Sequence, residues 1–189
     1  MSTMRKLLVP FLCAFVACPV FIVLHELGHC VAGIWLGARV QLHYANTMLT
    51  IPHDKDTPQT AIFHAAAGPL VSAGLVGTGF FWLYTVRRAR RGTNPTWSDW
   101  LATTLVLNAV RWIFSFIRPR HDEVVVSQGL GMPGWLLPCS LGLLAFIALV
   151  ATVRLHPPGA RLLPFTCLSA GGLLGTLVWT RLLGPIVLP

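Results

Sequence analysis

Long apolar stretches alternate with short polar and basic segments along this chain. Five stretches are long enough to cross the hydrocarbon core of a membrane as helices, since about 20 residues rising ~1.5 Å each span it. They lie within residues 7–37 and at about 61–86, 100–117, 135–153 and 163–183. The pattern therefore predicts an all-α integral membrane protein with about five transmembrane helices.

A polar connection at residues 39–59 separates the first two predicted spans. Apolar and polar residues alternate at 40–44 and again at 49–51, and residues 45–47 can form a turn between them. Alternation with a period of two is typical of a strand with one covered face. This segment is therefore predicted to be a short hairpin, with a plain loop as the alternative.

The charge of the chain is concentrated between the apolar stretches. Only 11% of the 189 residues are charged, against about 25% in an average soluble domain, and the net charge is +8. No base-stacking motif accompanies the basic residues, so we expect anionic lipid headgroups and not nucleic acid as their partner. With the N-terminus inside, eight Lys and Arg residues fall on the inner side and four on the outer side. The small size and the Arg-rich loops favour a bacterial inner membrane.

The string His25-Glu26-Leu27-Gly28-His29 is an H-E-x-x-H motif within the first predicted span. Residues four apart lie on one face of a helix, so the two imidazoles can bind one Zn²⁺. The intervening carboxylate can then act as the general base that takes a proton from a water molecule. Three ionisable groups within five residues of a membrane helix indicate function, since such groups are costly there.

A catalytic zinc has three protein ligands, so a third must come from elsewhere in the chain. In a chain that crosses the membrane back and forth, Asp122, just past the third predicted span, lies on the same side as His25 and His29. Asp99, at the opposite end of that span, is about a membrane thickness away. Asp122 is therefore the predicted third ligand. The alternatives are His64, His121 and Glu123.

In these motifs the sequence resembles the site-2-protease family of intramembrane zinc metalloproteases. The resemblance covers about residues 19–130 and rests on three elements in order: the H-E-L-G-H string, Ala67-Gly68-Pro69, and Asn108 followed by Pro119 and Asp122. It implies His25, His29 and Asp122 as zinc ligands, Glu26 as the base and Asn108 as a substrate-binding residue. It also implies that the hairpin corresponds to the family's sheet-like segment near the active site.

The chain departs from the family pattern at three places. Ser72 stands where family members often have Asn soon after Gly-Pro, and Asp122 is followed by Glu123 where the family usually has Gly. The family's Asp is also usually preceded by a short Pro-rich stretch that begins with Asn, whereas Asn108 lies fourteen residues before Asp122. Residues 1–189 are expected to form one membrane-embedded domain, with a protease core at about 7–130 and two additional helices at about 134–187.

The expected function is that of an intramembrane zinc endopeptidase that cuts membrane-anchored proteins. Two alternatives are a catalytically silent zinc-binding scaffold and a small metal transporter. A pure scaffold has no need for Glu26. A transporter is expected to carry further ionisable residues along a path through several helices, and the last two predicted spans carry only Arg181.

Overall fold

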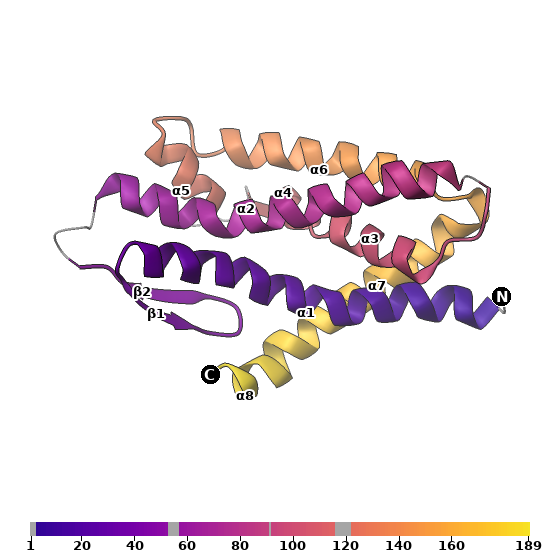
Figure 1. Ribbon diagram of the computed structural model, residues 1–189, viewed down its shortest axis with the longest axis horizontal. Helices are drawn as coiled ribbons and strands as arrows, with labels where there is room; N and C mark the ends of the chain where they lie inside the picture. Colours follow the sequence, from indigo (N-terminus) through magenta and orange to yellow (C-terminus); the bar gives the residue numbers. More distant parts are fainter. Residues whose placement is uncertain (1–2, 53–56, 91, 116–121) are drawn as a thin grey trace.

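The chain folds into a bundle of helices with one small β-hairpin at one end (Figure 1). The structure, a computed structural model, describes residues 3–52, 57–90, 92–115 and 122–189. The α-helices are α1 (Thr3–Trp35), α2 (Pro58–Trp82), α3 (Trp97–Leu107), α4 (Val110–Ser115), α5 (Asp122–Gly129), α6 (Leu136–Leu155), α7 (Leu162–Val178) and α8 (Gly184–Val187). The strands are β1 (Arg39–Leu42) and β2 (Thr47–Thr50). Two π-helical segments, Leu83–Arg87 and Trp179–Leu183, and a 3₁₀ turn, Pro158–Ala160, complete the described elements.

Four helices in the described part of the chain are long and apolar enough to cross a membrane. They are Met4–Trp35, Pro58–Arg87, Leu136–Leu155 and Pro158–Val187. Large apolar side chains on their outer faces stay exposed, among them Leu143, Phe146 and Ile147 of α6. A soluble protein would bury such a surface, so the chain is an integral membrane protein with an all-α architecture.

The stretch predicted as a third span differs from the prediction. Residues 97–115 form two short helices, α3 and α4, which meet at Asn108 and Ala109. The amides of Ala109, Arg111 and Trp112 each bond to the carbonyl three residues back, which breaks the regular α-helical pattern. Asn108 and Arg111, at this break, both line a cleft that is described below.

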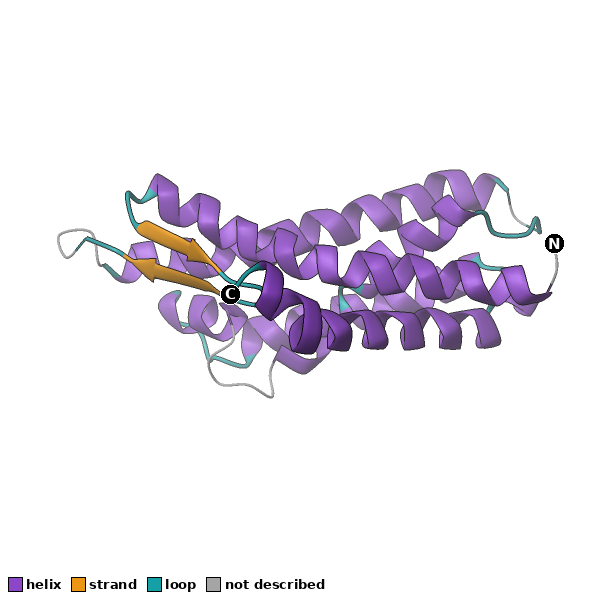
Figure 2. Ribbon diagram, turned by 90° about the horizontal axis from the view of Figure 1, so that it is seen from below, coloured by secondary structure: helices purple, strands orange, loops and turns teal. Residues whose placement is uncertain are grey.

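The hairpin follows α1 through a sharp reversal. Gly37 has φ +73°, a conformation that favours glycine, and Ala38 N donates to the Gly33 carbonyl as the helix ends. β1 and β2 then pair antiparallel with Arg39 opposite Thr50 and Leu42 opposite Thr47. Figure 2 shows the hairpin at the end of the bundle opposite the N-terminus, with the C-terminus beside it.

α7 packs along α1 at close range. Built Cβ atoms at Gly171 and Gly175 would meet the carbonyl oxygens of Phe11 and Phe15. Small residues allow helix backbones to approach closely in membranes, where contact rather than hydrophobic exclusion drives association. The last span is therefore built into the same bundle as α1, and does not form a separate appendage.

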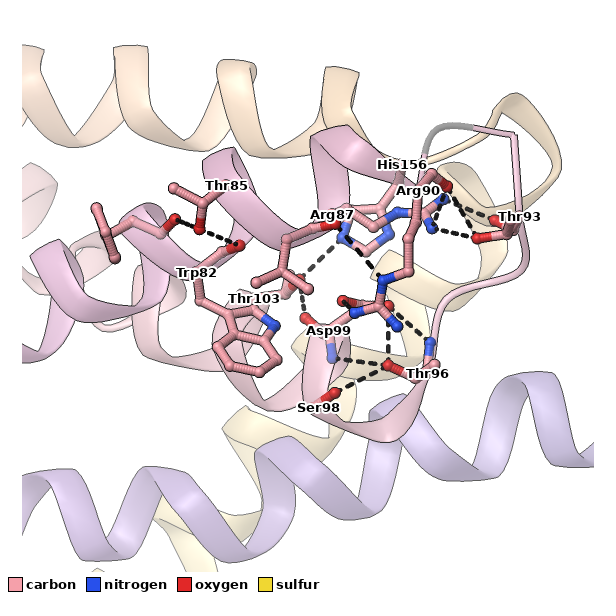
Figure 3. A network of polar contacts seen from close by, with 12 residues as sticks. Trp82, Thr85, Arg87, Arg90, Thr93, Thr96, Ser98, Asp99, Thr103 and His156 are labelled. Atoms are coloured by element: carbon pink, nitrogen blue, oxygen red, sulfur yellow. Dashed lines mark hydrogen bonds and ion pairs between the residues drawn. The ribbon is translucent and has the colours of Figure 1, made fainter.

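A polar cluster lies where α2 gives way to α3, at the end of the bundle that carries the N-terminus in Figure 1, and Figure 3 shows its side chains. The fully buried Arg87 donates to the carbonyl and the hydroxyl of Thr93 at 2.7 and 3.1 Å. Asp99 caps α3 by accepting from the Thr96 amide and hydroxyl at 2.8 and 2.9 Å, and it pairs with Arg90. These contacts satisfy charges that would otherwise be costly to bury.

His156 belongs to the same cluster and is buried. The hydroxyl of Thr103 donates to the Asp99 carbonyl at 2.7 Å, so it accepts from His156 Nε2 at 2.9 Å. The ring stacks on Trp100 at a centroid distance of 4.7 Å and meets the edge of Phe165 at 5.3 Å. Burial, reinforced by the nearby Arg87 guanidinium, lowers the pKa of His156 to about 4.

The fold is expected to lose stability in mild acid because of His156. An imidazole that stays neutral when folded but ionises near pH 6.5 when unfolded favours the unfolded state as the pH falls from about 6.5 to about 4. The loss is on the order of 3 kcal/mol over that window. Thermal unfolding in detergent at pH 7 and pH 4.5 measures it, with His156→Gln as the control that lacks this component. Equal pH dependence in the two proteins would contradict the assignment.

Candidate metal centre

The H-E-x-x-H motif lies in the second half of α1 and brings two imidazoles together. His25 and His29 are 5% and 4% exposed, and their Nε2 atoms lie 3.3 Å apart. The rings meet edge to face, with centroids 4.9 Å apart. The helical spacing of four residues thus points both Nε2 atoms at one place.

Asp122, the first residue of α5, completes the group. Its Oδ2 atom lies 3.2 Å from His25 Nε2 and 3.3 Å from His29 Nε2. Among the described residues, these three are the group whose ligand atoms converge, all within 4.8 Å of one another. Zinc bonds of about 2.0–2.1 Å in tetrahedral geometry place neighbouring ligand atoms ~3.3 Å apart. The spacing of the three atoms therefore fits a zinc ion.

The carboxylate of Asp122 is held in its ionised form. Burial would raise its pKa, but hydrogen bonds and charge interactions with His25 and His29 outweigh that effect and keep the pKa well below its usual range. An ionised carboxylate is the form that ligates a metal.

The remaining ring nitrogens have partners that orient the imidazoles. His29 Nδ1 lies 2.8 Å from the His64 carbonyl oxygen, which can only accept, so Nδ1 carries a proton and Nε2 is the nitrogen that would bind a metal. His25 Nδ1 lies 3.1 Å from the Ser72 hydroxyl and 2.6 Å from Arg111 Nη1. A guanidinium only donates, so the 2.6 Å contact makes His25 Nδ1 an acceptor from Arg111 in this structure. Ligation of a metal through His25 Nε2 requires the imidazole proton on Nδ1, where the Ser72 hydroxyl can accept it once Arg111 moves away.

Gly68 allows α2 to pass directly beneath the two histidines. A Cβ atom built at Gly68 would collide with His29 Nε2 and would lie 2.7 Å from His25 Nε2. A Cβ at Gly28 would likewise lie 2.8 Å from the Ala67 carbonyl oxygen. The Ala-Gly-Pro element of α2 and the glycine of the H-E-L-G-H string are thus the points where α1 and α2 touch.

Glu26 lies beside the three-residue group and is held by the hairpin. It is buried, and its Oε2 atom and its backbone carbonyl each lie 3.0 Å from the Thr47 hydroxyl. Thr47 is the first residue of β2. The hairpin therefore contributes a hydrogen bond to the carboxylate that the motif predicts to be the base.

A cleft of about 810 Å³ opens onto these residues. Its walls come from α1, the hairpin turn, α2, the α3–α4 junction, α5 and α7. The polar side chains that line it are His25, Glu26, His29, Asn46, Thr47, His64, Asn108, Arg111, Asp122, Ser169 and Thr176. Phe21, Ile22 and Leu173 supply apolar surface beside these polar groups.

Asn108 and Arg111 present polar groups from the α3–α4 junction. Asn108 Nδ2 is buried and has no hydrogen-bond partner among the described residues. Arg111 Nη2 lies 3.7 Å from Asp122 Oδ2 and 3.8 Å from Glu123 Oε1. One unpaired amide and one cation therefore face the same space as the histidines.

The alternative third ligands are placed differently. Glu123 is fully buried and its carboxylate lies beside Arg111, outside the converging group. The His64 ring packs against the His29 ring with centroids 4.8 Å apart and lines the cleft. The backbone carbonyl of His64 accepts a hydrogen bond from His29 Nδ1. His121 lies outside the described residues. Asp99 caps α3 in the cluster at the other end of the bundle.

Ser72, noted in the sequence only as a departure from the family pattern, follows Gly68 by one helical turn, so the same-face rule was a signal for its place beside His25. Two further contributors to the site escape sequence reasoning. Thr47 reaches Glu26 only because the hairpin folds back on α1, and no local pattern marks it. The α7 wall of the cleft is likewise a tertiary feature.

Comparisons with protein-family models, with curated proteins and with solved structures find no match to this chain.

Proposed function

We propose that this chain is an intramembrane zinc endopeptidase. The observation that carries the proposal is the convergence of His25, His29 and Asp122 on one point, with Glu26 beside it at the edge of a membrane-embedded cleft. The resemblance to site-2 proteases points to the same chemistry and assigns the same ligands.

The donor set suits zinc, because two imidazoles and one carboxylate leave the fourth tetrahedral position open. When bound, zinc supplies Lewis-acid activation of a water molecule and of the scissile carbonyl. Within the cleft, Glu26 accepts a proton from the attacking water as the new C–O bond forms. The proton then passes to the leaving amine nitrogen as the C–N bond breaks, so the carboxylate is regenerated.

Asn108 is proposed to bind the substrate main chain, and Arg111 is proposed to balance negative charge in the cleft. The unpaired Asn108 amide can donate to a main-chain carbonyl of an extended substrate, which has lost its own helical hydrogen bonds. Arg111 is a permanent cation on the cleft wall, 3.7 Å from Asp122. It is placed to oppose negative charge that develops during peptide hydrolysis.

The proposed substrate is a membrane-spanning protein. The cleft lies between candidate membrane spans and presents apolar as well as polar surface. We further propose that the chain resides in a bacterial inner membrane, with its arginine-rich loops against anionic lipid headgroups.

Replacement of Asp122 tests the proposal. Wild type is co-expressed with a panel of single-span membrane proteins tagged at both ends, and fragments are scored alongside Asp122→Ala and the control Gln128→Ala, an exposed position on the same helix. Wild type and Gln128→Ala are expected to cut a member of the panel and to hold about one zinc per chain. Asp122→Ala is expected to lose both. Full cleavage by Asp122→Ala would contradict the assigned ligand set.

A further inference from the structure

Trp179 and Leu188, in the last eleven residues of the chain, bind the turn of the hairpin. Trp179 Nε1 donates to the Tyr44 carbonyl oxygen at 2.8 Å, and the Tyr44 amide donates to the Leu188 carbonyl oxygen at 3.1 Å. Both polar main-chain groups of Tyr44 are therefore held by a segment that follows it by more than 130 positions. Figures 1 and 2 show the C-terminus beside the hairpin in both views.

The packing at this contact is close and requires a glycine. A Cβ atom built at Gly184 would lie 2.6 Å from Tyr44 Cβ and 2.9 Å from Tyr44 Cγ. The π-helical segment Trp179–Leu183 between α7 and α8 precedes this glycine. Segments of this kind are rare and recur at functional sites, because they re-aim the residues around them.

The same turn carries the residue that holds Glu26. His43 N donates to the Asn46 carbonyl at 2.9 Å and closes the turn, and Thr47 follows at once. Thr47 Oγ1 lies 3.0 Å from Glu26 Oε2. A continuous path of direct contacts thus runs from Trp179 through the turn to the proposed base.

A hairpin of two four-residue strands is marginally stable without outside support. The turn at Tyr44 is its far end, away from the start of β1 and the end of β2 where the chain enters and leaves. The hydrogen bonds from Trp179 and to Leu188 supply support at that end. Without them, the position of Thr47 is left to the strand pairing and to its own contact with Glu26.

We propose that Trp179 is a positioning residue and that Trp179–Leu188 is a clamp that holds Thr47 on Glu26. The catalytic part of this inference rests on the proposed peptidase function, whereas the clamp itself does not. The last span then has a direct role at the active site: it lines the cleft with Gly172, Leu173 and Thr176, and its continuation fixes the orientation of the base.

Two measurements on Trp179→Phe test the clamp and its role separately. The change keeps an aromatic ring and removes only the N–H donor, and Trp35→Phe is the matched control, since Trp35 is 81% exposed. Amide hydrogen exchange in residues 43–47 is expected to rise about tenfold in Trp179→Phe, in line with one lost hydrogen bond. The kcat for a substrate found in the panel is expected to fall about tenfold, with a smaller change in KM and unchanged zinc content.

Thr47→Val distinguishes positioning from general loss of structure. It keeps the side-chain shape and removes the hydroxyl, and it is expected to lower kcat about as much as Trp179→Phe. If Trp179 acts through Thr47, the double variant is no slower than Thr47→Val alone. Multiplicative losses, or an unchanged kcat in Trp179→Phe, would overturn the positioning role. Unchanged amide hydrogen exchange at residues 43–47 in Trp179→Phe would overturn the clamp. This measurement needs no substrate, so it tests the clamp even if wild type shows no cleavage.

Discussion

Replacement of Gly68 by alanine is expected to abolish zinc binding. The added methyl group would occupy the space of both imidazoles, since the built Cβ atom collides with His29 Nε2 and lies 2.7 Å from His25 Nε2. The neighbouring backbone cannot yield easily, because Gly28 also brings α1 within contact of the Ala67 carbonyl. Either the helices separate or the histidines rotate, and both outcomes destroy the spacing that fits a metal.

Gly77→Ala is the matched control for this change. Gly77 lies in the same helix, and a Cβ atom built there meets nothing within 4 Å. Zinc affinity is expected to fall more than ~100-fold in Gly68→Ala, beyond the 10–100-fold effect typical of the residues that support metal ligands. It is expected to be unchanged in Gly77→Ala. Titration of both purified proteins with zinc in the presence of a competing chelator measures the difference. Equal affinities would show that the approach of α2 does not set the site.

Glu26→Gln is expected to retain zinc and to lose cleavage. The Glu26 carboxylate is not one of the three converging ligands, and its Oε2 atom accepts a hydrogen bond from the Thr47 hydroxyl. Glutamine preserves the size of the side chain and can still accept that hydrogen bond, but it cannot take a proton from water. Loss of a general base lowers kcat by about 10²–10⁴-fold.

Glu26→Gln is informative only if zinc binding and cleavage are measured separately. Zinc content and thermal stability are measured on the same preparation as kcat, so that misfolding is not mistaken for loss of chemistry. Cleavage by Glu26→Gln within a few-fold of wild type would contradict the assigned base. Loss of zinc along with activity would instead make Glu26 a part of the metal site.

The sequence was most informative where a short-range rule applied. A spacing of four residues on a helix is enough to place His25 and His29 together, and in the structure their Nε2 atoms lie 3.3 Å apart. The placement of Asp122 needed only the alternating direction of the chain through the membrane. It survives the division of the third predicted span into α3 and α4, because the two short helices still carry the chain back toward the end of the bundle that holds the motif.

The sequence was least informative where distant segments meet. The break at Asn108 and Ala109 was not predicted, because the length and hydropathy of residues 100–117 are those of a single span. The contact between Thr47 and Glu26 depends on a hairpin folding onto a helix. The pairing of Trp179 with Tyr44 joins the last span to the first loop. The last two predicted spans carry only one ionisable residue and were predicted to be additional helices outside the core of the site. In the structure α7 nevertheless lines the cleft through small and neutral side chains.

The metal content of the purified protein tests the central claim most directly. Elemental analysis is expected to find about one zinc per chain, and X-ray absorption is expected to show only nitrogen and oxygen neighbours at about 2.0–2.1 Å. A preparation that binds no zinc after loading would contradict the account and leave the buried histidines as helix-packing polar groups. A sulfur neighbour at about 2.3 Å would contradict it as well, by placing a cysteine such as Cys30 in the ligand set.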